Sequence, residues 1–225
     1  QLQTALNALL DNEPIQYIIG SVVFAGLRLK VDERVLIPRP ETEELVHWLL
    51  STYNAETPLR VLDIGTGTGA IGISLDLALP SAFVAAFDVS EDALKTARIN
   101  AEKLESKVSL GKQDILNPSY QGDSFDIIVS NPPYVLNKEK KEMESNVLEY
   151  EPHLALFVED EDPLLFYREI IKFSRTYLNK KGKLYFEINE KFGQETTDLM
   201  NNDFSEIKIL KDLNGKDRII SAKKN

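Results

Sequence analysis

Apolar positions along the chain follow two alternating patterns. Short apolar runs typical of buried strands alternate with longer segments in which apolar residues recur every three or four positions, as in amphipathic helices. From residue 60 onward the pattern predicts strand, helix, strand and helix, at Arg60 to Ile64, Ala70 to Leu79, Phe83 to Phe87 and Glu91 to Leu104. This order predicts a parallel sheet with helices packed against it.

The second half of the chain continues the sheet. We expect strands at Val108 to Leu110, Phe125 to Ser130 and Lys183 to Ile188, a helix at Pro163 to Leu178, and a closing hairpin of Glu206 to Leu210 with Arg218 to Ala222. The turn Asp212-Leu213-Asn214-Gly215 suits that hairpin, because asparagine followed by glycine adopts tight turns. The whole pattern predicts an α/β fold.

The segment before residue 41 has a different pattern. Residues 17–37 are β-like, with Leu27 and Leu29 alternating with charged residues, which predicts a small hairpin. Thr4 to Leu10 is typical of the end of a helix, and a helix from Glu41 to Tyr53 follows two prolines. We therefore expect three parts, namely a helical remnant or linker at residues 1–15, a β-hairpin connector at residues 16–40, and the main domain at residues 41–225.

The composition is that of a soluble globular domain. A chain of 225 residues, 43% hydrophobic and 28% charged, is long enough to bury a core. No signal-peptide pattern and no apolar run of about 18 residues mark export or membrane insertion, which favours a cytoplasmic location. Zero cysteines exclude disulfides and thiolate metal sites, and with two histidines we expect no metal. The net charge of −10 argues against broad, sequence-independent binding to nucleic acid.

Glycines cluster where the first strand of the sheet leads into a helix. The turn consists of Gly65, Thr66, Gly67, Thr68 and Gly69, directly after Asp63 and Ile64. Glycines there let a ligand approach the main chain closely, with the amides of the helix N-terminus facing it. Asp88, at the end of the next strand, is placed to bind ribose hydroxyls. Because Gly67, Gly69 and Gly72 also fit the dinucleotide fingerprint, the turn alone leaves the type of ribose-containing cofactor open.

The tetrapeptide Asn131-Pro132-Pro133-Tyr134 follows the expected buried strand Phe125 to Ser130. In an open parallel sheet this loop should face the same cleft as the glycine turn. A planar nitrogen is a poor nucleophile, and an enzyme activates it by accepting its N–H hydrogens, here on the Asn131 side-chain oxygen and the Pro132 carbonyl. The prolines stiffen the loop, and Tyr134 is able to stack on the flat acceptor. We therefore interpret the tetrapeptide as a loop that presents an amide or amine nitrogen for methyl transfer, rather than as a proline-rich turn that only ends a strand.

With these residues in place, the chain resembles the HemK/PrmC family of glutamine methyltransferases, which modify peptide chain release factors. The resemblance covers nearly the whole sequence. Besides the glycine turn, Asp88 and the Asn131 loop, it includes Leu36-Ile37-Pro38-Arg39-Pro40-Glu41-Thr42-Glu43, Tyr150-Glu151-Pro152 with Ala155-Leu156, Phe186-Glu187-Ile188, and Asp212-Leu213 with Gly215-Lys216-Asp217-Arg218. The segment Arg39 to Glu43 is the most specific to the family.

The resemblance implies a class I S-adenosylmethionine-dependent methyltransferase fold. This is a Rossmann-like, mostly parallel sheet of seven strands with helices on both faces, whose last strand is antiparallel, preceded by a helical domain for substrate recognition. By motif match, the cofactor S-adenosylmethionine, which becomes S-adenosylhomocysteine, would contact Gly65, Thr66, Gly67, Thr68, Gly69, Asp88, Ile115 and Asn131. Asp114 would project toward the adenine, although a surface-loop role suits it equally well.

The resemblance also implies the substrate. The acceptor would be the side-chain amide nitrogen (N5) of the glutamine in the Gly-Gly-Gln loop of a release factor, held by Asn131, Pro132, Pro133 and Tyr134. Methylation of an exocyclic amine of adenine or guanine in DNA or RNA is the alternative, and a non-catalytic binding module is a third reading. We expect a monomer without stable nucleic-acid or membrane binding.

Two stretches depart from the family pattern. Val158 to Pro163 stands where a glycine-rich turn is usual, and Asn189 stands where glycine is usual. The charged residues Lys138 to Glu144 fit either a lid over a bound peptide or a solvated helix face.

Overall fold

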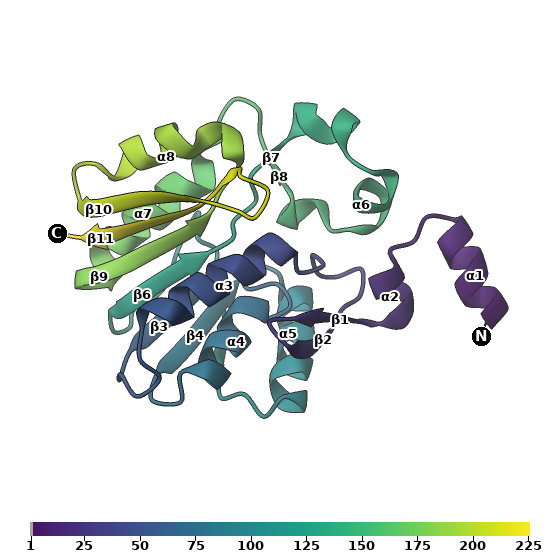
Figure 1. Cartoon of the computed structure of the whole chain (residues 1–225), viewed down its shortest axis with the longest axis horizontal. Helices are drawn as coiled ribbons and strands as arrows, with labels where there is room; N and C mark the ends of the chain where they lie inside the picture. Colours follow the sequence, from purple (N-terminus) through teal and green to yellow (C-terminus); the bar gives the residue numbers. More distant parts are fainter. Residues whose placement is uncertain (1) are drawn as a thin grey trace.

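A seven-stranded sheet runs through the centre of the computed structural model, which describes residues 2–225 (Figure 1). Its strand order is β10-β11-β9-β6-β3-β4-β5. The strands are β3 (Arg60–Ile64), β4 (Phe83–Asp88), β5 (Ser109–Lys112), β6 (Phe125–Ser130), β9 (Leu178–Glu187), β10 (Phe204–Lys211) and β11 (Asp217–Lys224). Only β11 runs antiparallel to its neighbours, β9 and β10, and the other pairs are parallel. The predicted mostly parallel sheet with an antiparallel last strand is confirmed.

Alternate residues of the strands feed two separate cores. Val61 of β3 packs in the core beneath α3, α4 and α5, whereas Leu62 packs in the core beneath α7 and α8. This alternation is the two-residue period of a strand buried on both faces. The helices are α3 (Pro40–Thr52), α4 (Ala70–Ala78), α5 (Glu91–Lys103), α7 (Leu165–Tyr177) and α8 (Gly193–Met200). The expected α/β fold with helices on both faces is confirmed.

The N-terminal segment is only partly as expected. The hairpin is present as β1 (Ser21–Phe24) and β2 (Leu27–Lys30), paired antiparallel. The β-like prediction was wrong at its start, because residues from 15 onward form the helix α2 (Ile15–Ile19). This helix follows Pro14 and stops at Gly20, whose φ of 75° is left-handed, so it is too short to show a helical period.

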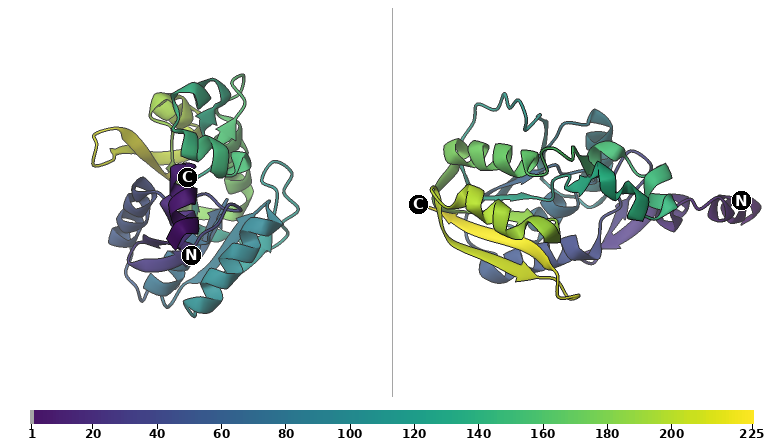
Figure 2. Two further views of the ribbon diagram at one scale, coloured as in Figure 1. Left: turned by 90° about the vertical axis from the view of Figure 1, so that its right-hand side faces the viewer. Right: turned by 90° about the horizontal axis from the view of Figure 1, so that it is seen from above.

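The hairpin is fastened to the main domain beside the glycine turn. The side chain of Asn100 in α5 accepts from the Lys30 backbone N–H at 2.6 Å and donates to the backbone oxygens of Lys30 and Thr68 at 3.1 and 2.9 Å. Helix α1 (Leu2–Leu10) instead extends away from the domain, as Figure 1 and the right-hand view of Figure 2 show. The hairpin is therefore held against the sheet domain, whereas α1 is not.

A long segment after β6 crosses the end of the sheet. It contains β7 (Val135–Leu136), the 3-10 helix η1 (Asn137–Glu142), α6 (Ser145–Tyr150), η2 (His153–Ala155) and β8 (Phe157–Val158), and η3 (Glu190–Phe192) follows β9. Strands β7 and β8 pair with each other in parallel, outside the main sheet. Across residues 2–225, none of the helices has the length and apolar character needed to cross a membrane.

Candidate active site

A cavity of about 890 Å³, open to solvent, lies at the carboxyl ends of β3, β4, β5 and β6. Most of its lining residues lie at the ends of these strands or in the loops that follow them, namely Ile64, Gly65, Gly67, Asp88, Val89, Ser90, Gln113, Asp114, Ile115, Ser130, Asn131, Pro132 and Pro133. The remaining wall comes from Arg34, Val35 and Leu36 between the hairpin and α3, from Ala93 of α5, and from Pro152, Leu154, Ala155, Phe166 and Ile170. Its position at the carboxyl ends of the strands suits a nucleoside ligand.

The glycine turn contributes glycines to this cavity rather than free amides. Gly65 and Gly67 line the cavity, with φ values of 76° and 55° that favour glycine. The N–H groups of Gly65 and Thr66 both donate to the backbone oxygen of Phe87, at 2.8 and 3.0 Å. The first two amides of the turn are therefore engaged within the fold, and the glycines leave room for a ligand to approach the main chain closely.

Thr66, Thr68 and Gly69 hold the turn in shape through contacts within the fold, away from the cavity. The Thr66 hydroxyl donates to Oδ2 of the fully buried Asp63 at 2.6 Å, and the Thr68 hydroxyl oxygen accepts from the backbone N–H of Ala70 at 3.2 Å. Gly69 has a φ of 83°, which favours glycine, and a Cβ there would lie 2.7 Å from the end of the Ile73 side chain, which would have to move. None of the three is among the residues that line the cavity.

Asp88 joins the glycine turn to the end of β4. Its Oδ2 accepts from the backbone N–H of Gly67 at 2.8 Å, and its Oδ1 accepts from the backbone N–H of Ser90 at 2.9 Å. Burial raises the pKa of Asp88, and these hydrogen bonds act in the opposite direction. Each carboxylate oxygen keeps a further lone pair, which suits the two hydroxyls of a ribose.

The loop after β5 forms part of the cavity wall. Ile115 and Asp114 both line it. Oδ1 of Asp114 also accepts from the backbone N–H of Leu116 at 2.9 Å, so this carboxylate caps its own loop. Asp114 thus lines the cavity and also stabilises a surface loop, so both roles considered for it from the sequence are compatible with its position.

The Asn131 loop stands between this cavity and a second one. The second cavity, of about 560 Å³, shares Leu36, Asn131, Pro132 and Ala155 with the first. Its other lining residues are Arg39, Tyr134, Val135, Met143, Val147, Leu156 and Glu187. A donor in the first cavity and an acceptor in the second would therefore meet at Asn131 and Pro132.

Buried polar side chains support the Asn131 loop from the side of the second cavity. The Asn131 Nδ2 donates to Thr42 Oγ1 at 3.0 Å, and the Thr42 hydroxyl donates to Glu187 Oε2 at 2.6 Å. The Tyr134 hydroxyl donates to Glu187 Oε1 at 2.8 Å. Burial raises the pKa of Tyr134 well above its usual range, and the neighbouring Glu187 carboxylate raises it further.

Arg39 forms the rim of the second cavity. It donates through Nη2 to Oε1 of the buried Glu151 at 2.5 Å, while Oε2 of Glu151 accepts from the backbone N–H of Ile37 at 3.0 Å. Glu151 thereby fixes the segment that runs from the hairpin to α3.

The positions of Thr42, Glu187 and Arg39 in the site were not predicted from the sequence. All three lie in segments that carry the family resemblance, at Arg39 to Glu43 and at Phe186-Glu187-Ile188, but no spacing rule connects them to Asn131. Asn189, the departure noted above, donates through Nδ2 to the backbone oxygen of Tyr134 at 3.1 Å and so supports the same loop.

The parallel sheet with its antiparallel last strand, the glycine turn and the carboxylate after β4 define a class I methyltransferase. The profile of the family described as "Methyltransferase small domain" matches residues 44–151. A methyltransferase from Pyrococcus furiosus has the same fold, with a TM-score of 0.64 and 19% identity over 99% of this chain and 98% of that one. A 16S rRNA N2 G1207 methyltransferase from Thermus thermophilus superposes with a TM-score of 0.64 and 17% identity, covering 91% of this chain and 50% of that one.

Relatives found by sequence define the family more narrowly than these similar structures do. A release factor glutamine methyltransferase from Bacteroides thetaiotaomicron is 51% identical over 99% of this chain and 80% of its own length. Proteins of the same name from Flavobacterium psychrophilum and Bacillus subtilis are 50% and 42% identical, over 99% and 94% of this chain and 79% and 76% of their own lengths. The chain belongs to the family of release factor glutamine methyltransferases, which confirms the resemblance drawn from its motifs.

Proposed function

We propose that this chain transfers the methyl group of S-adenosylmethionine to the side-chain amide nitrogen (N5) of the glutamine in the Gly-Gly-Gln motif of peptide chain release factors. The observation that carries this proposal is the position of Asn131 and Pro132, which line both the cavity at the glycine turn and the second cavity beside it. The names of the relatives supply the substrate class.

The first cavity fits the cofactor. Gly67 has open space where a Cβ would project, so the methionine part would lie against the main chain of Gly65 and Gly67. Asp88 would hold the ribose hydroxyls, and Ile115 would pack on the adenine. Thr66, Thr68 and Gly69 would act by holding the turn in shape. S-adenosylmethionine supplies a methyl group that is already activated by its bond to a sulfonium sulfur.

The protein's part in the reaction is alignment of the acceptor nitrogen. The amide lone pair is delocalised, so Asn131 Oδ1 and the Pro132 carbonyl would accept the two N–H hydrogens and turn the lone pair toward the methyl carbon. The nitrogen–carbon bond forms as the carbon–sulfur bond breaks, and the nitrogen then loses a proton. Pro132 and Pro133 lack N–H groups and restrict φ, so they hold the loop with few alternative conformations. Most of the acceleration comes from alignment and fixed polar groups.

Tyr134 would form a wall of the acceptor site. Its hydroxyl is engaged by Glu187, so the ring is held in one orientation beside the second cavity. A flat amide packs well against such a ring.

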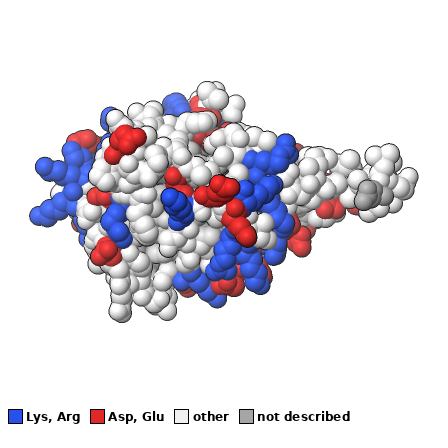
Figure 3. All heavy atoms as spheres, turned by 90° about the horizontal axis from the view of Figure 1, so that it is seen from below, with Lys and Arg blue, Asp and Glu red and all other residues white. Residues whose placement is uncertain are grey.

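Protein substrates fit the surface charge better than nucleic acid does. Figure 3 shows Lys and Arg gathered at two places on one face, at the end of the molecule opposite the N-terminal helix and in a band toward that helix, with Asp and Glu beside and between them. The net charge is −10. We propose a monomer without stable nucleic-acid binding, acting in the cytoplasm on release factors. Residues 41–225 would form the catalytic domain, residues 16–40 the connector, and residues 1–15 part of a substrate-recognition region.

A labelling experiment tests the proposal. The protein is incubated with methyl-labelled S-adenosylmethionine and a release factor, and with the same factor carrying Gln→Ala in its Gly-Gly-Gln motif. We expect label on the first factor and none on the second. Equal label on both factors, or label on added nucleic acid alone, would contradict the proposed substrate.

A further inference from the structure

A line of hydrogen bonds leads from the buried end of the second cavity to the amide of Asn131. It begins at Glu187, which is fully buried at the end of β9, and passes through Thr42, which is 5% exposed in the first turn of α3. Its two bonds measure 2.6 Å from Thr42 to Glu187 and 3.0 Å from Asn131 to Thr42. Two hydrogen bonds among residues 42, 131 and 187 therefore connect α3, the loop after β6 and the end of β9.

The chemistry of these groups fixes the direction of every bond. An ionised carboxylate only accepts hydrogen bonds, so the single hydroxyl hydrogen of Thr42 points to Glu187. The Thr42 oxygen is then left only as an acceptor, and Asn131 must face it with its NH2 group. The carbonyl oxygen of the Asn131 side chain consequently lies on the opposite side of the amide. A flipped Asn131 would place two oxygens without a shared hydrogen against each other.

The last hairpin of the chain supports the ionised form of Glu187. Burial raises the pKa of Glu187, and the hydrogen bonds that it accepts and the charge of Arg218 in β11 act in the opposite direction. Arg218 Nη1 also donates to the neighbouring Ile188 oxygen at 3.1 Å. Asp212 holds Arg218 by accepting from its Nε at 3.2 Å.

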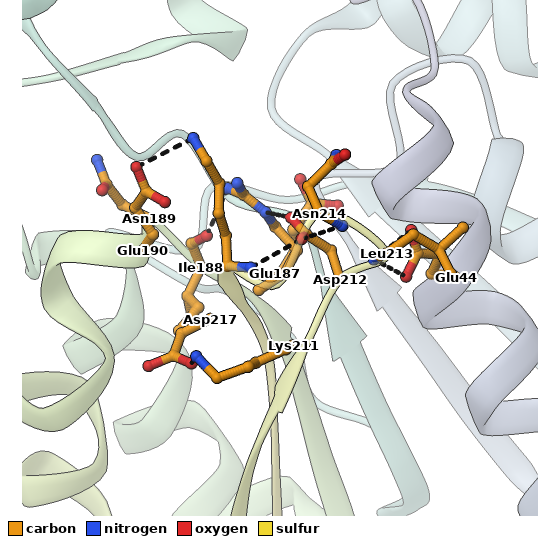
Figure 4. A network of polar contacts seen from close by, with 12 residues as sticks. Glu44, Glu187, Ile188, Asn189, Glu190, Lys211, Asp212, Leu213, Asn214 and Asp217 are labelled. Carbon is orange, nitrogen blue, oxygen red and sulfur yellow. Dashed lines mark hydrogen bonds and ion pairs between the residues drawn. The ribbon is translucent and has the colours of Figure 1, made fainter.

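The hairpin loop is itself anchored in several directions. Figure 4 shows Asp212 at the centre of these contacts, with the next residue, Leu213, reaching the carboxylate of Glu44 in α3. The motifs around Asp212 and Arg218 thus belong to the same supporting structure as Glu187, although the cofactor cavity does not include them.

We propose that Thr42 and Glu187 are positioning residues, which hold the Asn131 side chain with its oxygen toward the acceptor nitrogen. Neither is a catalytic residue in this account, because both act through Asn131 and Tyr134. The inference rests on the proposed methylation of an amide nitrogen, since that acceptor would donate its N–H to the Asn131 oxygen. It adds to that function the reason why the oxygen, and not the NH2 group, faces the substrate.

The orientation of Asn131 is measurable without any substrate. In a 15N–1H spectrum the side-chain NH2 pair of Asn131 is assigned by its loss in Asn131→Ala. We expect the Thr42→Val variant, which keeps the shape of the side chain but loses the hydroxyl, to shift this pair and speed its hydrogen exchange. Thr42→Ser should leave it near its wild-type position. Thr52→Val is the matched control, because Thr52 is an exposed threonine of the same helix.

Kinetics with a release factor then test the consequence. We expect Thr42→Val to lower kcat about tenfold or more, the size of a lost hydrogen bond in a site that depends on it, with KM and cofactor Kd within about twofold. Thr42→Ser should restore most of kcat. In an Asn131→Ala background Thr42→Val should cause little further loss, because Thr42 acts through Asn131.

Distinct results would overturn the inference and the proposed function. An unchanged Asn131 amide pair in Thr42→Val, or a full additional loss of kcat in the Asn131→Ala background, would show that Thr42 does not position Asn131. If the wild-type protein methylates no release factor, the proposed function fails, and the amide spectrum still decides the orientation of Asn131. Thermal unfolding of each variant separates these effects from a loss of fold.

Discussion

A Cβ atom placed on Gly65 would lie 3.9 Å from the backbone oxygen of Asn131. Gly65 follows β3 and Asn131 follows β6, and these two strands are neighbours in the sheet. The residues just before them, Ile64 and Ser130, lie opposite each other in the two strands although they are 66 positions apart in the sequence. The glycine turn and the Asn131 loop therefore meet at one edge of the sheet, which is the arrangement that the proposed transfer requires.

Replacing Asn131 should separate binding from turnover. Asn131→Ala removes the side-chain oxygen that would accept from the acceptor nitrogen but leaves the glycine turn and Asp88 in place. We expect cofactor Kd to change by no more than a few-fold, whereas kcat falls on the order of a hundredfold or more. Isothermal titration with the cofactor and a turnover assay with a release factor measure the two effects. Asn202→Ala, an exposed asparagine just before β10, is the control.

An equal loss of cofactor affinity and of turnover in Asn131→Ala would contradict the assigned role. The residue would then belong to the cofactor site alone.

Replacing Gly67 or Gly69 of the turn by alanine should affect different properties, cofactor affinity in the first case and stability in the second. Both have positive φ, which costs about 1 kcal/mol for a residue with a Cβ. On Gly67 the Cβ would enter open space in the cavity, so Gly67→Ala should fold and bind the cofactor at least tenfold more weakly. On Gly69 it would lie 2.7 Å from Ile73, so Gly69→Ala should lower Tm by clearly more than Gly67→Ala does.

Thermal unfolding without ligand and cofactor titration distinguish the two variants. A Gly67→Ala protein with wild-type cofactor affinity would show that the cofactor does not approach this glycine.

Asp63 should make stability fall with rising pH. Burial raises its pKa from 3.8 to about 7, and hydrogen bonds from Thr66 and Gly72 only partly offset this. Between these two pH values the folded chain retains a proton that the unfolded chain has lost. The contribution of Asp63 to the free energy of unfolding is therefore greatest at the acidic end of the window and declines toward neutral pH, by up to about 1.4 kcal/mol per pH unit.

Asp63→Asn, which has no such proton, is the test. Urea unfolding of both proteins from pH 5 to 8 should show the wild type losing stability relative to the variant as pH rises. A difference that stays constant across this range would mean that Asp63 does not titrate there.

Ionisation of Glu187 should set the acidic limit of activity, and the hydrogen bond from Tyr134 should influence the pH at which that limit lies. Burial raises the pKa of Glu187, while hydrogen bonds from Thr42 and Tyr134 and the charge of Arg218 lower it, and Glu41 raises it. Tyr134→Phe removes one donor to the carboxylate, so the pKa of Glu187 rises further. Protonated Glu187 no longer accepts from both partners, and the acid limb of kcat should move to higher pH.

The kcat profile of Tyr134→Phe against pH measures this shift. Tyr53→Phe serves as control, because the Tyr53 hydroxyl faces that of Tyr185 at 3.2 Å rather than a carboxylate. An acid limb at the same pH in wild type and Tyr134→Phe would exclude Glu187 as the ionising group.

Local pattern was sufficient to predict the strands of the sheet and the glycine turn. Strand β3 was predicted with the bounds it has, and the glycine turn and Asp88 lie where the strand–helix rhythm put them. Each of these features depends on neighbouring residues, such as buried alternation in a strand or glycine where φ is positive. The short helix α2 and the helix α8 were not predicted, since α2 has too few residues for a period and α8 contains two buried threonines, Thr196 and Thr197.

The supporting contacts of the site could not be predicted in this way. Thr42 and Glu187 are 145 positions apart, and their hydrogen bond exists only because α3 and β9 pack together. The second cavity likewise depends on the segment around Met143 and Val147, whose charged sequence shows no strong period. Within Lys138 to Glu144, which stays open between a lid and a solvated helix face, Glu139 accepts from the backbone N–H of Leu136 at 3.0 Å and pairs with Lys191.

The central claim is that a glutamine side-chain nitrogen receives the methyl group at Asn131. The most direct measurement is fragment-ion mass spectrometry of a release factor after incubation with this protein and S-adenosylmethionine carrying a trideuterated methyl group. The account predicts one trideuteromethyl group on the side chain of the Gly-Gly-Gln glutamine, and none when Asn131→Ala is incubated for the same short time. A label on any other residue, or an equal yield from Asn131→Ala, would contradict it.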